Sequence, residues 1–150
     1  MRRAGFTILE VIVSFAIVSL LLAIAAPRLA ALGPSLSLER SARFLALDLE
    51  KTRWLAIARN SRARLDVDLA SGRYAAEVEG DSGYVPVFAR DLPSGIGFDE
   101  DASTRVAGGR IAIVFQPRGN TFSNATIALA AAGDRLRRVV VNQAGRVRCN

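Results

Sequence analysis

The first part of the chain is an almost unbroken apolar stretch. Residues 6–26 cover 21 positions, and Glu10 is the only charged residue among them. A helix of that length, at about 1.5 Å per residue, spans about 30 Å, which is the thickness of a bilayer's hydrocarbon core. The pattern therefore predicts a membrane-crossing helix over residues 6–27, preceded by a short basic leader at residues 1–5.

The apolar spacing changes after Ser35. Apolar or small residues then recur at steps of three and four, which places them on one stripe of an amphipathic helix. Pro27 and the Gly33–Pro34 pair are expected to bend or loosen this helix without ending it, because a proline removes one backbone hydrogen bond. We expect the helix to continue over residues 28–60, with a buried stripe of Leu38, Ala42, Leu45, Leu49, Thr52 and Ala56.

Two large apolar residues of this segment lie on its charged side. Leu47 and Trp54 are seven positions apart and so fall close to one line along the helix. One interpretation is that the domain wraps further round the helix and buries them. The other is that they contact a neighbouring subunit in a fibre.

Beyond Asn60 the apolar period becomes two, which is typical of half-buried strands. Turn residues separate the strands, and Pro86 suits an edge strand because it cannot donate a ladder hydrogen bond. We predict an α+β fold in which the long N-terminal α-helix packs on antiparallel β-sheet, with residues 61–150 as one β-rich domain. The predicted strands are residues 65–69, 73–78, 84–88, 96–98, 111–115, 126–131, 136–141 and 146–149.

The net charge of +6 is unevenly distributed. Residues 28–64 hold eight basic and three acidic residues, residues 65–132 five basic and nine acidic, and residues 133–150 five arginines and one aspartate. Arg2 and Arg3 favour a cytoplasmic N-terminus by the positive-inside rule. In a bacterium this predicts a single-pass protein of the inner membrane with its domain in the periplasm.

Several kinds of chemistry are excluded by composition. The sequence has no histidine and one cysteine, Cys149, so histidine- or cysteine-based catalytic and metal centres are ruled out. No segment resembles a nucleophile elbow or a phosphate-binding loop. The acidic run 99–101 lacks the ligand spacing of a calcium loop. We predict no catalytic residue, no cofactor and no metal, and the role of Cys149 stays open.

Glu10 is unusual in a membrane helix. Burying a carboxylate there costs on the order of 3 kcal/mol, and an intramembrane ionisable group indicates a function with a charged partner. If the chain were cut after Gly5, the ammonium of Phe6 would become that partner, either in the same chain or in a neighbour.

This arrangement resembles the class III signal of type IV pilins and type II secretion pseudopilins. The resemblance implies that a prepilin peptidase cleaves after Gly5, that the new N-terminal Phe6 is methylated, and that Glu10 guides subunit addition. An ordinary secretory signal is the alternative, supported by the basic start and the small residues at 23–25, but its apolar region is usually only about 7–15 residues long. The residues that carry the resemblance are Gly5, Phe6, Thr7, Ile8, Leu9, Glu10 and Pro27.

The C-terminal half is similar to the domain of H-type minor pseudopilins, which the minor pilins FimT and FimU share. Residues 113–119, 127–129, 138–141 and 145–147 carry this likeness. It implies a non-enzymatic subunit of a periplasmic pseudopilus, assembled with minor pseudopilins of the I, J and K types above the major pseudopilin G. The alternative is that the protein is a FimT- or FimU-like minor pilin of a type IV pilus.

Five arginines gather near the C-terminus, namely Arg135, Arg137, Arg138, Arg146 and Arg148. The segment 145–148 is similar to a G-R-x-R ending of FimT-like pilins that take up DNA, and arginine clusters neutralise phosphates. DNA is thus a partner under the pilus alternative. A solvated or partner-facing surface and ion pairs with the acidic middle of the chain are the other interpretations.

Overall fold

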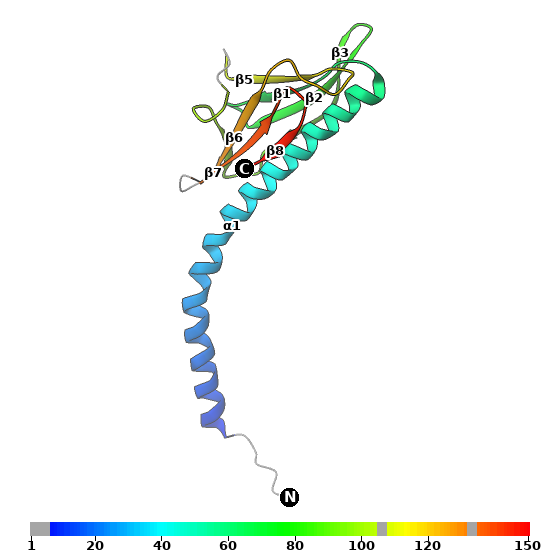
Figure 1. The fold of residues 1–150 in the computed structure, drawn as a ribbon. Helices are drawn as coiled ribbons and strands as arrows, with labels where there is room; N and C mark the ends of the chain where they lie inside the picture. Colours follow the sequence, from blue (N-terminus) through cyan, green and yellow to red (C-terminus); the bar gives the residue numbers. More distant parts are fainter. Residues whose placement is uncertain (1–6, 105–107, 132–134) are drawn as a thin grey trace, which may run out of the picture. The chain divides into compact units, whose positions relative to one another are not determined.

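The computed structural model describes residues 7–104, 108–131 and 135–150, apart from the side chains of residues 27–32 and 34. One helix is followed by eight strands in this part of the chain (Figure 1). By contacts the chain forms two compact units, Met1–Gly33 and Pro34–Asn150. The elements are α1 (Ile8–Arg59), β1 (Ala63–Asp68), β2 (Arg73–Gly80), β3 (Gly83–Asp91), β4 (Ile96–Asp99), β5 (Arg110–Phe115), β6 (Ala125–Ala131), β7 (Arg135–Val141) and β8 (Val147–Cys149).

Helix α1 runs for 52 residues and is capped at both ends. At its start, the backbone N–H of Glu10 donates to Thr7 Oγ1 at 3.2 Å, so Thr7 serves as the N-cap. At its end, Asn60 adopts a left-handed φ of 48°. Ser61 N–H then donates to the carbonyl of Ala56 at 3.2 Å, which is the bonding of a Schellman cap. The backbone stays helical through both prolines, as the sequence predicted.

The strands form two four-stranded antiparallel sheets. The first sheet has the order β3-β2-β1-β5, and the second has the order β4-β6-β7-β8. Each predicted strand corresponds to an observed one with small shifts at its ends. Pro86 lies in β3, an edge strand, beside a register shift between Ala76 and Glu77 of β2. The α+β prediction and the edge placement of Pro86 are both confirmed.

The core lies between α1 and the inner faces of both sheets. All six residues of the predicted helical stripe, from Leu38 to Ala56, are buried. Every second residue of β1 faces them, beginning with Ala63, and Ile127 and Val139 do the same in the second sheet. In Figure 1 the part of α1 after residue 34 runs alongside these strands. The spacing of the stripe therefore selects the face of α1 on which the sheets pack.

One buried polar group connects three elements. Asp48 of α1 has a side chain only 8% exposed, and its Oδ2 lies 2.8 Å from Arg90 Nε of β3. The Tyr74 hydroxyl of β2 donates to the same oxygen at 2.8 Å. Burial, and after it the hydrogen bond to Asp48, raises the pKa of Tyr74, so the hydroxyl stays protonated and remains a donor. The three side chains tie the helix to the first sheet.

We predict that Asp48→Ala lowers the free energy of unfolding of residues 34–150 by about 2–3 kcal/mol, because it leaves the Tyr74 hydroxyl buried without a partner. Urea denaturation measures the loss. Glu39→Ala is the matched control, since it removes an exposed pair with Arg43 and should cost less than about 0.5 kcal/mol. Equal losses in the two variants would contradict the role of Asp48.

Candidate functional sites

The first site is the apolar segment of α1. Residues Ile8–Ala26 form a helical stretch of 19 residues that is long and apolar enough to cross a membrane. Gly5 and Phe6, the predicted cleavage and methylation positions, lie outside the described residues. The candidate membrane span thus begins at Ile8, three residues after Gly5, the predicted cleavage position.

Glu10 lies in the first turn of α1. Its backbone carbonyl accepts a hydrogen bond from Ser14 Oγ at 2.7 Å, while its carboxylate has no hydrogen-bond or ion-pair partner among the described residues. The positive end of the helix dipole favours a negative charge at this position. Thr7 and Glu10 have the T-x-x-E spacing of a capping box, a signal from which the N-cap role of Thr7 could have been predicted. The Glu10 charge remains available to an outside partner.

The second site is the outer helix face, which we define as Leu36, Phe44, Leu47 and Trp54. Leu47 is 63% exposed and Trp54 is 61% exposed, so the interpretation that the domain wraps round and buries them is wrong. At 100° per residue, Leu36, Leu47 and Trp54 fall within about 20° of one line, roughly opposite the buried stripe. Leu36 and Phe44 were not predicted to lie on this face. For Leu36 the signal is present, because the steps of 11 and 18 residues to Leu47 and Trp54 correspond to whole turns.

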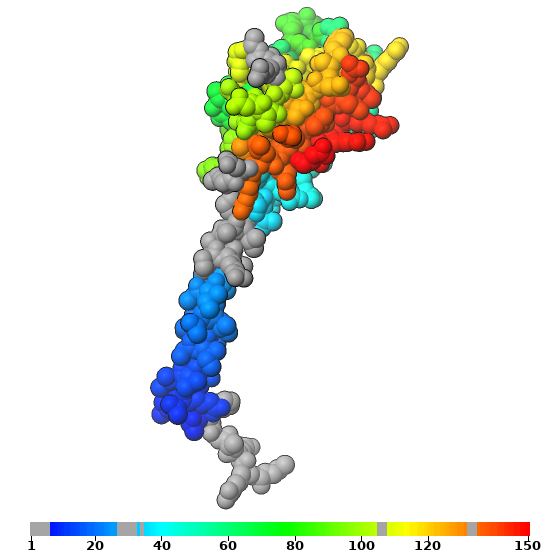
Figure 2. All heavy atoms as spheres, turned by 60° about the vertical axis from the view of Figure 1, so that its left-hand side comes forward, coloured from blue at the N-terminus to red at the C-terminus, as the bar shows by residue number. Residues whose placement is uncertain are grey.

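The third site is the arginine-bearing pair of strands β7 and β8, drawn from orange to red at the surface in Figure 2. All five predicted arginines are exposed. Val139 and Val141 of β7 face the core, so Arg138 points to the outer face of the sheet. Arg148 shares that face, because it pairs with Val140. Arg137 lies on the opposite face of β7, so the structure divides a cluster that the sequence treated as one.

Four of the nine acidic residues at 65–132 pair with arginines outside the C-terminal segment. Glu77 and Asp68 lie 2.7 Å and 3.5 Å from Arg64 and Arg110 of the first sheet. In the part of the chain that the structure describes, no acidic group lies within ion-pair distance of four of the C-terminal arginines. The ion-pair interpretation is therefore wrong for Arg137, Arg138, Arg146 and Arg148.

Beside these strands, Arg53 of α1 and two turns, residues 116–119 and 142–145, lie in close contact and form a junction. Arg53 Nε of α1 donates to the carbonyl of Gly119 at 2.8 Å. Gly145 has a φ of 73°, and a Cβ at this position would lie 1.9 Å from the same carbonyl oxygen. Thr121 N–H donates to the carbonyl of Gln143 at 2.9 Å, which joins the two turns again. The junction fixes the start of β8, and with it Arg146, relative to α1.

Possible metal ligands do not cluster in the described part of the chain. Among residues 7–104, 108–131 and 135–150, no three histidine, cysteine, aspartate or glutamate side chains gather in a way that could hold an ion. Asp99, from the acidic run, accepts the backbone N–H of Ala102 at 2.8 Å and so closes its own turn.

A helix whose first half can cross a membrane and whose second half packs on antiparallel sheets, with a carboxylate in its first turn, defines a pilin-like subunit. Residues 41–145 match the family described as Type II transport protein GspH, and residues 1–26 match the prokaryotic N-terminal methylation motif. The chain belongs to the GspH family and carries the motif of a prepilin peptidase substrate. The resemblance drawn from its sequence is confirmed.

Similar proteins come from both secretion and pilus systems. The pilin-like protein PilA1 of Thermus thermophilus is 31% identical over 160 residues, covering 99% of each chain. The minor pseudopilin EpsH of Vibrio cholerae shares the fold with a TM-score of 0.62 and 14% identity, over 76% of this chain and 96% of EpsH. The minor pilin FimU of Pseudomonas aeruginosa follows with a TM-score of 0.60 and 17% identity, over 75% and 87%. The chain is a pseudopilin or minor pilin, a structural class of subunit.

We predict that Gly145→Ala destabilises residues 34–150 by about 3 kcal/mol, because it adds a clash with Gly119 to the cost of a left-handed alanine. Gly95→Ala is the matched control, since Gly95 has a similar φ of 82° and open space around it. The control should lose only about 1 kcal/mol in urea denaturation. Equal losses would show that the close approach of the two turns is unimportant.

Proposed function

We propose that the protein is a minor pseudopilin of a type II secretion system, with a structural role in export of folded proteins across the outer membrane. The observation that carries the proposal is the match of residues 41–145 to the GspH family, together with a helix whose first turn holds Glu10, a carboxylate with no partner among the described residues. A prepilin peptidase cleaves after Gly5 and methylates Phe6. The protein itself performs no catalysis.

Glu10 makes the transfer from membrane to fibre favourable. In lipid its carboxylate has no fixed partner, and burying it unpaired costs on the order of 3 kcal/mol. In a helical bundle it can bind the N-terminal ammonium of a neighbouring subunit, while the apolar residues around it remain covered. The apolar segment therefore exchanges one apolar environment for another and gains an ion pair.

The outer helix face supplies a second assembly contact. Large exposed apolar side chains that form one surface are typical of protein interfaces. Leu47 and Trp54 contact a neighbouring subunit on the side of α1 opposite the core. A head-to-tail contact of this kind does not close on itself and so extends into a fibre.

The partners in this proposal are the minor pseudopilins of the I, J and K types and the major pseudopilin G. The subunit waits in the inner membrane with its N-terminus in the cytoplasm and its domain in the periplasm. The basic residues at positions 2 and 3 support that orientation. After assembly it belongs to the periplasmic pseudopilus.

We predict that Glu10→Ala reaches the membrane and is cleaved normally but co-purifies with the other pseudopilins at least about tenfold less well, since each 1.4 kcal/mol of lost contact is a factor of ten. Membrane fractionation, the mobility of the mature chain and affinity capture from detergent extracts measure the three steps. Glu39→Ala is the control for loss of a glutamate on the same helix. Normal capture of the Glu10 variant would refute the docking role.

A FimT- or FimU-like minor pilin of a type IV pilus is the second candidate. Three exposed arginines support it, because Arg138 and Arg148 share one face, Arg146 precedes Arg148 in the same short segment, and none has an acidic partner among the described residues. Such a surface neutralises phosphates, and under this candidate the arginines bind DNA for natural transformation.

If this second function holds, residues 34–150 bind duplex DNA with an affinity that falls steeply with salt. The double variant Arg138→Ala, Arg148→Ala should then weaken binding and reduce the slope of log affinity against log salt by about 0.9 per lost phosphate contact. Arg62→Ala, Arg73→Ala is the control, since it removes the same charge from one exposed arginine just before β1 and another at the start of β2. No binding at low salt would exclude the DNA function.

A further inference from the structure

Strand β5 leaves one edge of the first sheet open. It is the last strand in the order β3-β2-β1-β5. Among the described residues its ladder partner is β1, and on the other edge only Phe115, at its end, forms a bridge. The backbone N–H of Leu69 donates to the carbonyl of Gly109 at 2.9 Å, so Gly109 directs its backbone polar groups toward the β1 side. In an antiparallel pair this direction alternates from one residue to the next along the strand. Ile111 and Ile113 therefore direct their backbone polar groups toward β1. Ala112, which lies between them, directs its N–H and C=O away from the sheet.

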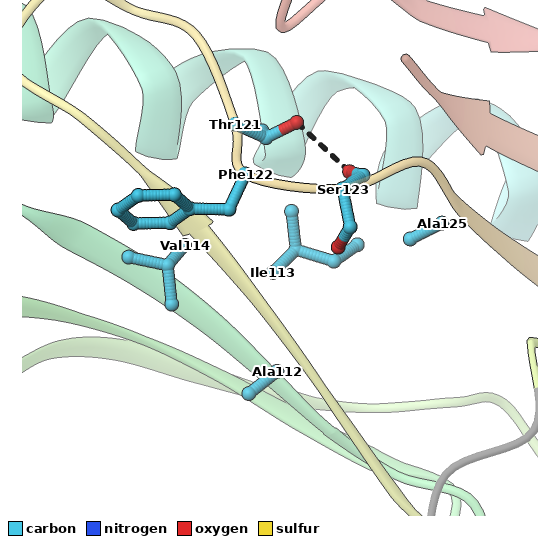
Figure 3. Close-up of a pocket in the computed structure, with 7 residues that line it drawn as sticks. All are labelled: Ala112, Ile113, Val114, Thr121, Phe122, Ser123 and Ala125. Carbon is cyan, nitrogen blue, oxygen red and sulfur yellow. Dashed lines mark hydrogen bonds between the residues drawn. The ribbon is translucent and has the colours of Figure 1, made fainter. Parts of the chain in front are cut away.

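The chain after β5 closes one end of this edge, and no described residue pairs with the rest of it. Gln116 N–H donates to the carbonyl of Asn120 at 2.8 Å, and Phe115 bridges Thr121, so the loop folds back there. Beyond that bridge the loop diverges and leaves a hollow with Ala112 and Val114 on one side and Phe122 and Ser123 on the other (Figure 3). Phe122, at the rim, is 66% exposed.

The two edges of the first sheet are protected to different degrees. Proteins commonly guard exposed edges with proline, charge or a bulge, because an unguarded edge pairs with other chains. Edge strand β3 has Pro86 and a register shift beside it. In β5 the only charged residue is Arg110 at its start, and residues 111–115 contain neither a proline nor a charge. The less protected edge is therefore the one that lies beside the hollow.

We propose that the open edge of β5 binds an extended segment of another pilin-like subunit, which adds to the first sheet as a strand. Backbone donors and acceptors that alternate along a strand are matched by an extended polypeptide. Small side chains at Ala112 and Ser123 leave room for its backbone. Because Phe122 and Ser123 line the hollow opposite Ala112, the space suits a single extended segment better than a whole sheet.

The side chains along the edge specify the composition of that segment. Arg110 at one end is 64% exposed and lies 3.5 Å from its acidic neighbour, Asp68, so it can take a second carboxylate. Val114 and Phe122 at the other end offer apolar surface. The segment therefore places an acidic residue beside Arg110 and an aliphatic residue beside Phe122. Since the occupant is a fellow subunit, this inference rests on the proposed function.

The test places a photo-crosslinking phenylalanine analogue at Phe122 of the full chain in cells. Capture of other pilin-like subunits reports assembly, and mass spectrometry of the crosslinked peptide reports the occupant of the hollow. Ala112→Pro removes the outward N–H without touching the β1 ladder, and should reduce crosslinking at least about fivefold. Ala112→Ser, which keeps the N–H, should leave crosslinking unchanged.

Arg110→Glu provides a variant that does not constrain the backbone. It should reduce crosslinking, whereas Arg73→Glu, an exposed arginine of β2 away from this edge, should not. Subunit capture without a Phe122 crosslink, crosslinks that persist in Ala112→Pro and Arg110→Glu, or crosslinks to a second copy would each overturn the inference and leave the proposed function intact. Failure to capture any subunit would contradict the proposed function and this inference with it.

Discussion

Contact between one stripe of α1 and the inner faces of two sheets is the interaction on which the rest of the fold depends. Each sheet has a single apolar face, and neither can bury that face without the helix. The stripe from Leu38 to Ala56 supplies the missing surface, and Asp48 adds a polar connection through Tyr74 and Arg90. The helix is thus part of the core of the domain as well as the carrier of the membrane segment.

Use of one helical face for the core leaves the opposite face uncommitted. Leu47 and Trp54 remain in solvent, although their side chains are as apolar as those of the core. In the assembly that we propose, this division lets the domain bury its core and still present the outer helix face to a neighbouring subunit. Glu10 is likewise left without a contact within the apolar segment, because its carboxylate has no partner among the described residues.

The C-terminal strands are held by close backbone approaches as well as by buried side chains such as Val139 and Val141. Gly119 and Gly145 touch where a Cβ cannot fit, and Arg53 extends the junction to α1. The glycine of the G-R-x-R segment therefore has a structural role, separate from whatever its arginines bind. The turn at Gly119 also closes one end of the β5 edge. The other end stays open because the chain after Thr121 diverges from β5 to reach β6.

The sequence by itself determined the helix, its buried stripe, all eight strands and the α+β class, because these follow from local periodicity and turn residues. It also identified the family from the first ten residues and the C-terminal strands. Only the tertiary structure decided that Leu47 and Trp54 are exposed, that the arginines divide between two faces of β7, and that their acidic counterparts are paired elsewhere. Those features depend on sheet order and strand register, which are set by contacts between residues far apart in the chain.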